Sequence, residues 1–246
     1  MLKTDSCNSS MLYSIADIKT KVPATGGMSS RCREYLVDGN DSEAEITIDA
    51  SLYDYDYWEK MGLDHDGAAY MASARQFYYA LLDFNGMMLH ATATVIDGET
   101  YLFAGQSGIG KSTHAELLKK HHPEAQLIND DKPALRYVDG RWMVYGTPWS
   151  GKNGININAK YPLKAITLLT TRRDRNDIRP ADSLMAAAGI ISCSAGRGSR
   201  ESMKKLATLV DRLMKDIPIY EMDSLADDAA GLMAYNTMKN EINNED

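Results

Sequence analysis

The segment Gly105-Gln106-Ser107-Gly108-Ile109-Gly110-Lys111-Ser112-Thr113 stands between a strand-like apolar run, residues 101–104, and a helix-like run, residues 113–120. In this strand, loop and helix order, a Gly-x-x-x-x-Gly-Lys-Ser sequence forms a cradle for phosphate groups. The glycines let successive backbone N–H groups point inward, and the helix adds the positive end of its dipole at the same place. The segment therefore predicts that the chain binds a nucleoside triphosphate.

The residues of this loop have separate expected roles. The phosphates would be held by the segment as a whole, that is by Gly105, Ser107, Gly108, Ile109, Gly110, Lys111, Ser112 and Thr113. The Lys111 ammonium would reach the outer phosphates as a point charge, and the Ser112 hydroxyl would be a ligand of Mg²⁺.

Composition limits the kind of protein that carries this loop. With 246 residues, 44% of them hydrophobic, the chain suits one large domain or one domain with a small appendage. The net charge of −7, without Lys/Arg runs longer than a pair, argues against a nucleic-acid partner. Cys7, Cys32 and Cys193 are too few and too far apart for a disulfide framework. No apolar run approaches the roughly 18 residues of a membrane span, and no signal peptide is evident, so we expect a cytoplasmic protein without a membrane partner.

Three segments are expected along the chain. Residues 1–60 predict a small β-rich lead-in, because residues 45–49 alternate between apolar and polar as a half-exposed strand does. The aromatic run at residues 53–58 is interpreted as a packed surface strand, since its aspartates disfavour a base-stacking platform. Residues 61–239 would form the phosphate-binding core, and residues 240–246 a disordered tail.

The pattern of the core predicts an α/β fold with a mixed, largely antiparallel sheet and flanking helices. Residues 67–84 predict a helix from apolar residues spaced three and four apart, and residues 87–96 predict a strand that turns at Asp97-Gly98 into the strand before the loop. The remaining predicted elements are strands at 125–129, 134–138, 141–145, 164–169 and 218–222, and helices at 181–188, 202–214 and 226–238.

Two later segments are candidates for chemistry. Asp130 and Asp131 follow a predicted strand, where a nucleotide enzyme needs a metal ligand and a base; the alternative is an Asp pair that caps a turn. In the loop 146–154, Lys152 could supply a charge and Trp149 a wall for an acceptor. An ordinary surface loop with a partly buried Trp is an equally good interpretation.

Taken in order, His90, the glycine loop and the Asp pair resemble the catalytic domain of the HPr kinase/phosphorylase family, which shares its core with ATP-type phosphoenolpyruvate carboxykinases. The resemblance covers residues 87–131 well and extends more loosely to about residue 238, in a compact stand-alone form. It implies that His90 lies beside the transferred phosphate, that Lys111 holds phosphate, and that Asp131 takes the proton of the acceptor. It also implies that Asp130 joins Ser112 at the metal. From the residue alone, His90 would be an ordinary strand histidine.

The family has a glutamate and an arginine–glycine signature after the Asp pair, where this chain has residues 146–152, so the resemblance does not extend to phosphorylase activity. The function it implies is an ATP- and Mg²⁺-dependent kinase that phosphorylates a hydroxyl, with Ser of a peptide or protein as the preferred acceptor. A small hydroxylated substrate, a non-catalytic nucleotide sensor and a carboxykinase-like enzyme are the alternatives. The acceptor and the oligomeric state, a homo-oligomer included, stay open.

Overall fold

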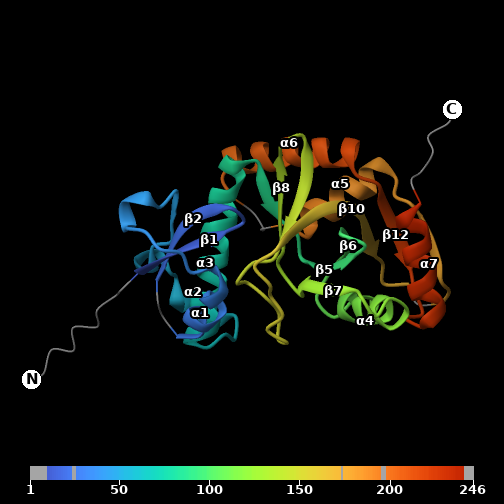
Figure 1. Cartoon of the computed structure of the whole chain (residues 1–246), viewed down its shortest axis with the longest axis horizontal. Helices are drawn as coiled ribbons and strands as arrows, with labels where there is room; N and C mark the ends of the chain where they lie inside the picture. The colour runs from blue at the N-terminus through green and yellow to red at the C-terminus, as the bar shows by residue number, and fades with distance from the viewer. Residues whose placement is uncertain (1–9, 24–25, 173, 195–197, 241–246) are drawn as a thin grey trace, which may run out of the picture.

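The computed structural model describes residues 10–23, 26–172, 174–194 and 198–240. These residues form a small sheet near the N-terminus and a large sheet with helices on both faces (Figure 1). The described helices are α1 (Gly26–Arg31), α2 (Tyr55–Lys60), α3 (His65–Leu81), α4 (Lys111–His121), α5 (Ser183–Ser192), α6 (Arg200–Asp216) and α7 (Asp228–Lys239). No helix in the described part of the chain combines the length and apolar character needed to cross a bilayer.

The large sheet is mixed and largely antiparallel, as the sequence predicts. Its strands lie in the order β4-β8-β9-β10-β6-β5-β7, with β12 beside β10 and β11 beside β12. Among the described strands of this sheet, only the pairings of β10 with β6 and of β10 with β12 are parallel. The strands are β4 (Gly86–Met88), β5 (Ala91–Ile96), β6 (Glu99–Ala104), β7 (Gln126–Asn129), β8 (Ala134–Val138), β9 (Arg141–Tyr145), β10 (Lys160–Leu169), β11 (Asp177–Pro180) and β12 (Ile219–Asp223).

Strand β6 shows why both faces of the large sheet are covered. Successive side chains on a strand point to opposite faces. Leu102 and Ala104 pack into the cluster under α5 and α6, whereas Tyr101 and Phe103 pack into the cluster under α4 and α7. All four side chains are buried. The continuous apolar run at residues 101–104 therefore reflects a strand buried on both sides.

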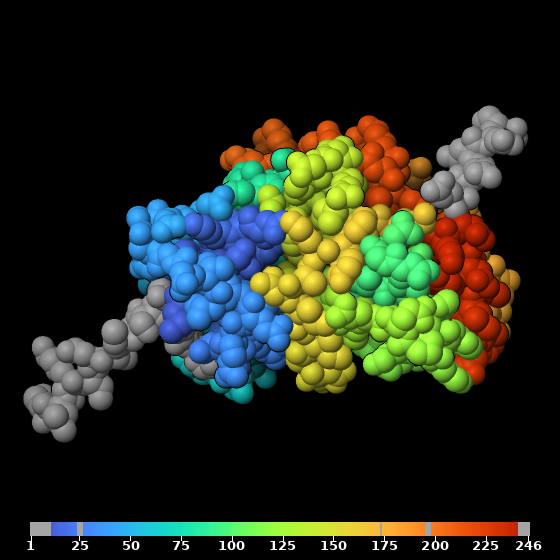
Figure 2. All heavy atoms as spheres, in the orientation of Figure 1, coloured from blue at the N-terminus to red at the C-terminus, as the bar shows by residue number. Residues whose placement is uncertain are grey.

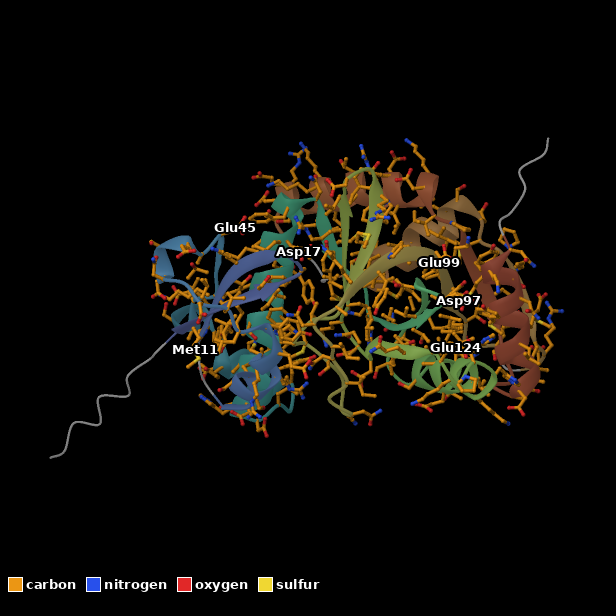
Figure 3. The ribbon with its side chains drawn as sticks, in the orientation of Figure 1. Met11, Asp17, Glu45, Asp97, Glu99 and Glu124 are labelled. Carbon is orange, nitrogen blue, oxygen red and sulfur yellow. The ribbon has the colours of Figure 1, made fainter. Side chains whose placement is uncertain are left out.

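The N-terminal part adds a third buried cluster. It contains the small sheet of β1 (Ser10–Ile15), β2 (Ile18–Pro23) and β3 (Ile46–Thr47), which packs with α3. The β1–β2 turn also reaches the large sheet. Asp17, which is labelled in Figure 3, accepts a hydrogen bond of 2.9 Å from the Tyr145 hydroxyl and one of 2.6 Å from Lys160. The N-terminal residues and the large sheet thus share a polar contact as well as a core.

Several predicted elements need correction. Residues 87–96 are two strands rather than one: β4 pairs with β8, β5 pairs with β6 and β7, and Leu89 and His90 lie between them. The run at residues 53–58 is not a surface strand but leads into helix α2. The Asp54 side chain caps that helix by accepting 3.0 Å from the Tyr57 amide. This cap outweighs the strand preference of the aromatic residues.

Other differences are smaller. Strand β11 was not predicted, and it pairs at the sheet edge with β12. In the predicted tail, Asn240 follows the end of α7, and residues 241–246 lie outside the described part of the chain.

Candidate functional site

The glycine-rich loop joins β6 to α4 in the predicted order. Gly105, Gly108 and Gly110 have φ of +154°, +78° and +114°, values that L side chains rarely adopt. A Cβ on Gly105 would also lie 2.9 Å from Cγ2 of Ile109. The loop backbone therefore depends on glycine at these positions. Ser107 and Gly108 are exposed at its outer side.

Lys111, the first residue of α4, turns back into this loop. Its ammonium donates to the carbonyls of Gly105 at 3.0 Å and Gln106 at 3.1 Å, and the residue is only 7% exposed. Burial lowers the pKa of Lys111, and the nearby Asp131 carboxylate partly opposes that shift. Ser112 and Thr113 follow at the exposed start of the helix.

A buried histidine holds the start of α4 against the end of β12. The ring of His114 lies with Nδ1 2.9 Å from the carbonyl oxygen of Gly110 and Nε2 2.9 Å from Oγ of Ser224. Burial lowers the pKa of His114. The imidazole is therefore a fixed bridge between the loop and a neighbouring strand end, a role that sequence reasoning missed.

His90 and Asp131 lie in direct contact. Nε2 of His90 is 3.0 Å from Oδ1 of Asp131. The backbone of His90 brings other segments to the same place: its N–H donates to the Cys193 carbonyl at 2.6 Å, and its carbonyl accepts from the Gly105 N–H at 3.4 Å. The junction between β4 and β5 therefore links the glycine loop to the Asp pair.

Asp131 has three side-chain partners. Besides His90, its other oxygen accepts from the Lys132 ammonium and lies 3.3 Å from the Tyr70 hydroxyl. Burial acts to raise the pKa of Asp131, but the hydrogen bond from His90 and the charge of Lys132 outweigh it and hold the pKa well below its ordinary value. These contacts therefore favour the ionised form of Asp131.

The turn that carries the Asp pair is fixed by the residue before it. Oδ1 of Asn129, at the end of β7, accepts from the amides of Asp131 at 2.9 Å and Lys132 at 2.8 Å. Such a side-chain turn sets the direction of the residues that follow. The side-chain amide nitrogen of Asn129 donates to the Thr147 carbonyl at 3.0 Å, and this hydrogen bond joins the turn to the loop after β9.

Asp130 has a different environment from its neighbour. It accepts a hydrogen bond from the Gly151 amide, and a Cβ on Gly151 would lie 3.0 Å from Oδ2 of Asp130. Burial raises the pKa of Asp130, the Gly151 amide opposes that shift, and the charge of Asp131 adds to it. The two adjacent carboxylates therefore have opposite shifts.

The loop 146–154 contains both residues predicted to contact an acceptor, and the two differ in exposure. Trp149 is 0% exposed and stacks on Phe77 with 4.7 Å between ring centroids, while its Nε1 donates to Ser73 at 3.0 Å. The prediction of a Trp149 wall is therefore wrong in this structure, because the large apolar ring is part of the core. Lys152 is exposed, as an acceptor contact requires.

Two residues of the N-terminal half complete the site. The Tyr70 hydroxyl lies 3.0 Å from the Ser150 carbonyl, and the Arg31 guanidinium donates to the same carbonyl at 3.0 Å and to the Ser150 hydroxyl at 2.7 Å. The Arg31 guanidinium also lies 5.1 Å from the Tyr70 ring centroid. In Figure 2 the residues after β9, in yellow, lie between the blue N-terminal residues and the green residues of β7 and α4.

These contacts decide which predicted residues come together. The structure gathers His90, Asp131 and Lys111 at the glycine loop, with Asp130 on the adjoining turn. Sequence reasoning missed Tyr70, Lys132, Asn129, Ser150 and Arg31. Only Lys132, directly after the Asp pair, had a local signal.

Ser112 and Asp130 are the two side chains predicted from the sequence to hold a magnesium ion. Among the residues that the structure describes, no three His, Cys, Asp or Glu side chains form a ready-made metal cluster. Mg²⁺ is usually bound by one or two carboxylates together with substrate phosphates and water. Ser112 is exposed at the start of α4, whereas Asp130 is buried on the turn after β7, so the two residues would supply one hydroxyl and one carboxylate to such an ion.

Comparison with known proteins gives likenesses among solved structures alone. No family model matches the chain, and no curated protein matches it. Among solved structures the chain is similar to the Hpr(Ser) kinase/phosphatase from Coxiella burnetii, with a TM-score of 0.36 and 12% sequence identity over 62% of this chain and 94% of that chain.

Proposed function

We propose that this protein is an ATP- and Mg²⁺-dependent kinase that transfers the γ-phosphate to a hydroxyl, with Ser of a peptide or protein as the acceptor. The observation that carries the proposal is the His90–Asp131 contact, in which an ionised carboxylate lies beside a histidine whose carbonyl accepts from the first amide of the glycine loop. A nucleotide site alone does not need this carboxylate. A hydroxyl nucleophile does.

The glycine loop would bind the phosphates of ATP. Lys111 now donates to the carbonyls of its own loop, and it would exchange those acceptors for phosphate oxygens. Ser112 and Asp130 would hold Mg²⁺, which would neutralise part of the phosphate charge. The Lys111 ammonium and the start of α4 both carry positive charge at this buried place, so they would favour phosphate over water.

Asp131 would serve as the acceptor of the hydroxyl proton. The oxygen of the Ser hydroxyl forms a bond to the γ-phosphorus, the bond from that phosphorus to the β–γ bridging oxygen breaks, and the proton passes to the Asp131 carboxylate as ADP leaves. A carboxylate with a lowered pKa is a weak base. Phosphoryl transfer through a loose transition state asks little of its base beyond positioning, and His90 and Lys132 position it.

A second candidate is a nucleotide sensor that transfers nothing. It is favoured by the same partners of Asp131, because His90, Lys132 and Tyr70 together occupy both of its oxygens. A small hydroxylated molecule is the alternative acceptor if the protein is a kinase.

Mass spectrometry tests the proposal. The protein is incubated with ATP, Mg²⁺ and a panel of Ser peptides and hydroxylated metabolites, with Lys111→Ala and Asp131→Asn in parallel and ATP affinity measured by calorimetry. One added phosphate with wild type, lost or strongly reduced with both variants, supports the kinase. ATP binding without a phosphorylated product across the panel favours the sensor, and absence of ATP binding overturns both.

A further inference from the structure

A cavity of about 370 Å³ lies between α2, α3 and the residues that contact Asp131. This volume is within the range of ligand sites, roughly 300 to 1,000 Å³. Its walls are aromatic and apolar, and they include Tyr57, Trp58, Met71, Tyr79 and Met88. A larger hollow of about 580 Å³ is lined by Glu99, Lys164 and Lys215 among others, but no residue of the proposed site lines it.

The inner end of the cavity meets the proposed catalytic residues. Lys132 lines the cavity, and its ammonium donates to Asp131 and, at 3.2 Å, to the Tyr70 hydroxyl. Ser194 also lines it and follows Cys193, whose carbonyl accepts from the His90 amide. A molecule in the cavity would therefore have one end beside the His90–Asp131 pair.

The lining selects an apolar group. The charged residues that line the cavity, Lys132 and Arg75, are both cations, and the Arg75 guanidinium lies 5.7 Å from the ring centroid of Tyr79. Tyr57 is 46% exposed at the cavity and Trp58 is partly exposed. Aromatic faces of this kind bind apolar and aromatic groups with specific geometry. The Lys132 ammonium is paired with Asp131, so the Arg75 guanidinium is the lining charge that disfavours a positively charged occupant.

The cavity is part of a longer surface. A second depression, of about 240 Å³, shares Tyr57, Trp58, Arg75 and Tyr79 with it and extends toward Leu52, Asp54 and Gln76. Leu52 is exposed there. Two adjoining depressions suit a bound peptide that places one side chain in each better than they suit a single compact molecule.

We propose that this surface of α2 and α3 binds the acceptor as a peptide, with an apolar or aromatic residue beside the acceptor Ser in the 370 Å³ cavity. This inference rests on the proposed kinase function for the identity of the acceptor. The N-terminal half of the chain then supplies specificity, and the glycine loop and Asp131 supply transfer.

The test joins a kinetic measurement to a binding measurement that needs no transfer. Rates of phosphorylation are measured for Ser peptides that differ only at the residues flanking Ser, with Phe, Leu, Gly or Lys. Binding of the same peptides without ATP is followed by fluorescence, because Trp142 and Trp149 are fully buried and Trp58 is the tryptophan that lines the cavity. Trp58→Phe is the control that identifies the source of the signal.

Tyr57→Ala and Arg75→Gln are the variants, because both side chains are exposed and contribute little to the core. The matched control for Tyr57→Ala is Leu184→Ala, an exposed apolar residue of α5. The matched control for Arg75→Gln is Arg212→Gln, a residue of α6 whose guanidinium lies 4.3 Å from the ring centroid of Tyr137. We expect kcat/KM for Phe or Leu peptides to exceed that for Gly peptides by about tenfold, and Tyr57→Ala to remove most of that preference. Arg75→Gln should weaken the selection against Lys, and the controls should behave as wild type.

The outcomes separate this inference from the proposed function. Peptide-dependent changes in Trp58 fluorescence without any transfer would support the peptide site and overturn the kinase. Transfer with no flanking preference, or with a preference that Tyr57→Ala leaves intact, would overturn the peptide site and leave the kinase standing. Phosphorylation of metabolites alone would do the same.

Discussion

Nε2 of His90 lies 3.0 Å from Oδ1 of Asp131, although the two residues belong to different strand ends of the large sheet. The contact depends on the break between β4 and β5, which turns His90 out of regular pairing. The amide of Ala91 then donates to the Asp131 carbonyl at 3.1 Å, so backbone and side chains hold the same two segments together. A carboxylate held from two sides has little freedom to reorient, which is what a positioned base requires.

Asp131→Asn should remove transfer and keep nucleotide binding. The amide cannot accept the hydroxyl proton, so kcat should fall by about 10²- to 10⁴-fold, while the glycine loop and Lys111 are unchanged and ATP affinity stays close to wild type. Steady-state kinetics and calorimetry measure the two quantities. Asp41→Asn is the control, since that carboxylate is paired with Lys21 on the surface. Wild-type turnover in Asp131→Asn would contradict the base assignment.

Tyr70→Phe should show that the N-terminal half supports the site. The change removes the hydroxyl that lies 3.3 Å from Asp131 and keeps the ring, over which the Lys132 ammonium lies 4.9 Å from the centroid. Loss of a hydrogen bond to a charged group should lower kcat by about tenfold or more, because it costs roughly 1.5 to 3 kcal/mol.

The control for Tyr70→Phe is Tyr145→Phe, which loses a hydroxyl contact to Asp17 in the turn between β1 and β2. Its kcat should match wild type. An equal loss in both variants would mean that the Tyr70 hydroxyl acts only through stability, and melting curves of the two proteins distinguish these cases.

The sequence predicted the parts of this site that lie close together in the chain. The glycine loop needs particular backbone angles, and only glycine adopts them readily, so Gly105, Gly108 and Gly110 mark the loop in any fold. Asp130 and Asp131 were predicted from an equally local feature, because they directly follow the strand predicted at residues 125–129. Most strands and helices after residue 60 were likewise predicted from apolar patterning, but β11 and the break between β4 and β5 were not.

The residues that sequence reasoning missed act over long range. Arg31 and Ser150 meet only because the N-terminal helices pack on the loop after β9, and no local pattern encodes that contact. For Trp149 the prediction of a surface role was wrong. Its glycine-rich surroundings are typical of a surface loop, but Phe77 and Ser73 of α3 contact its ring in the core. Tertiary packing decided these positions, and propensity did not.

Asp130→Asn should stabilise the protein at neutral pH. Because the folded state raises the pKa of Asp130, ionisation of this group costs stability, and the cost appears as pH rises above the unfolded value of about 3.9. The Asn oxygen can still accept from the Gly151 amide. We therefore expect a higher melting temperature than wild type at pH 7, with the difference shrinking as the pH is lowered below about 4.

Asp131→Asn is the matched comparison for that measurement. Its folded pKa is depressed, so the ionised form contributes stability above the unfolded value, and this contribution is lost as pH falls. Its melting temperature should be lower than that of wild type at pH 7. Shifts of the same sign in the two variants would refute the opposite environments of the neighbouring carboxylates.

Trp149→Phe should lower stability and leave activity intact. The smaller ring leaves a space beside Phe77 and removes the donor to Ser73, which should cost about 2 to 4 kcal/mol of unfolding free energy. Denaturant unfolding gives that quantity, and kcat/KM measured where the variant is folded should equal that of wild type. A Trp149→Phe protein of normal stability with a raised KM would return Trp149 to the acceptor site, because only a side chain outside the core could behave in that way.

Lys152→Ala makes the opposite test in the same loop. The exposed Lys152 side chain contributes little to stability, so the melting curve should not move. KM for a peptide acceptor should rise if the ammonium contacts it.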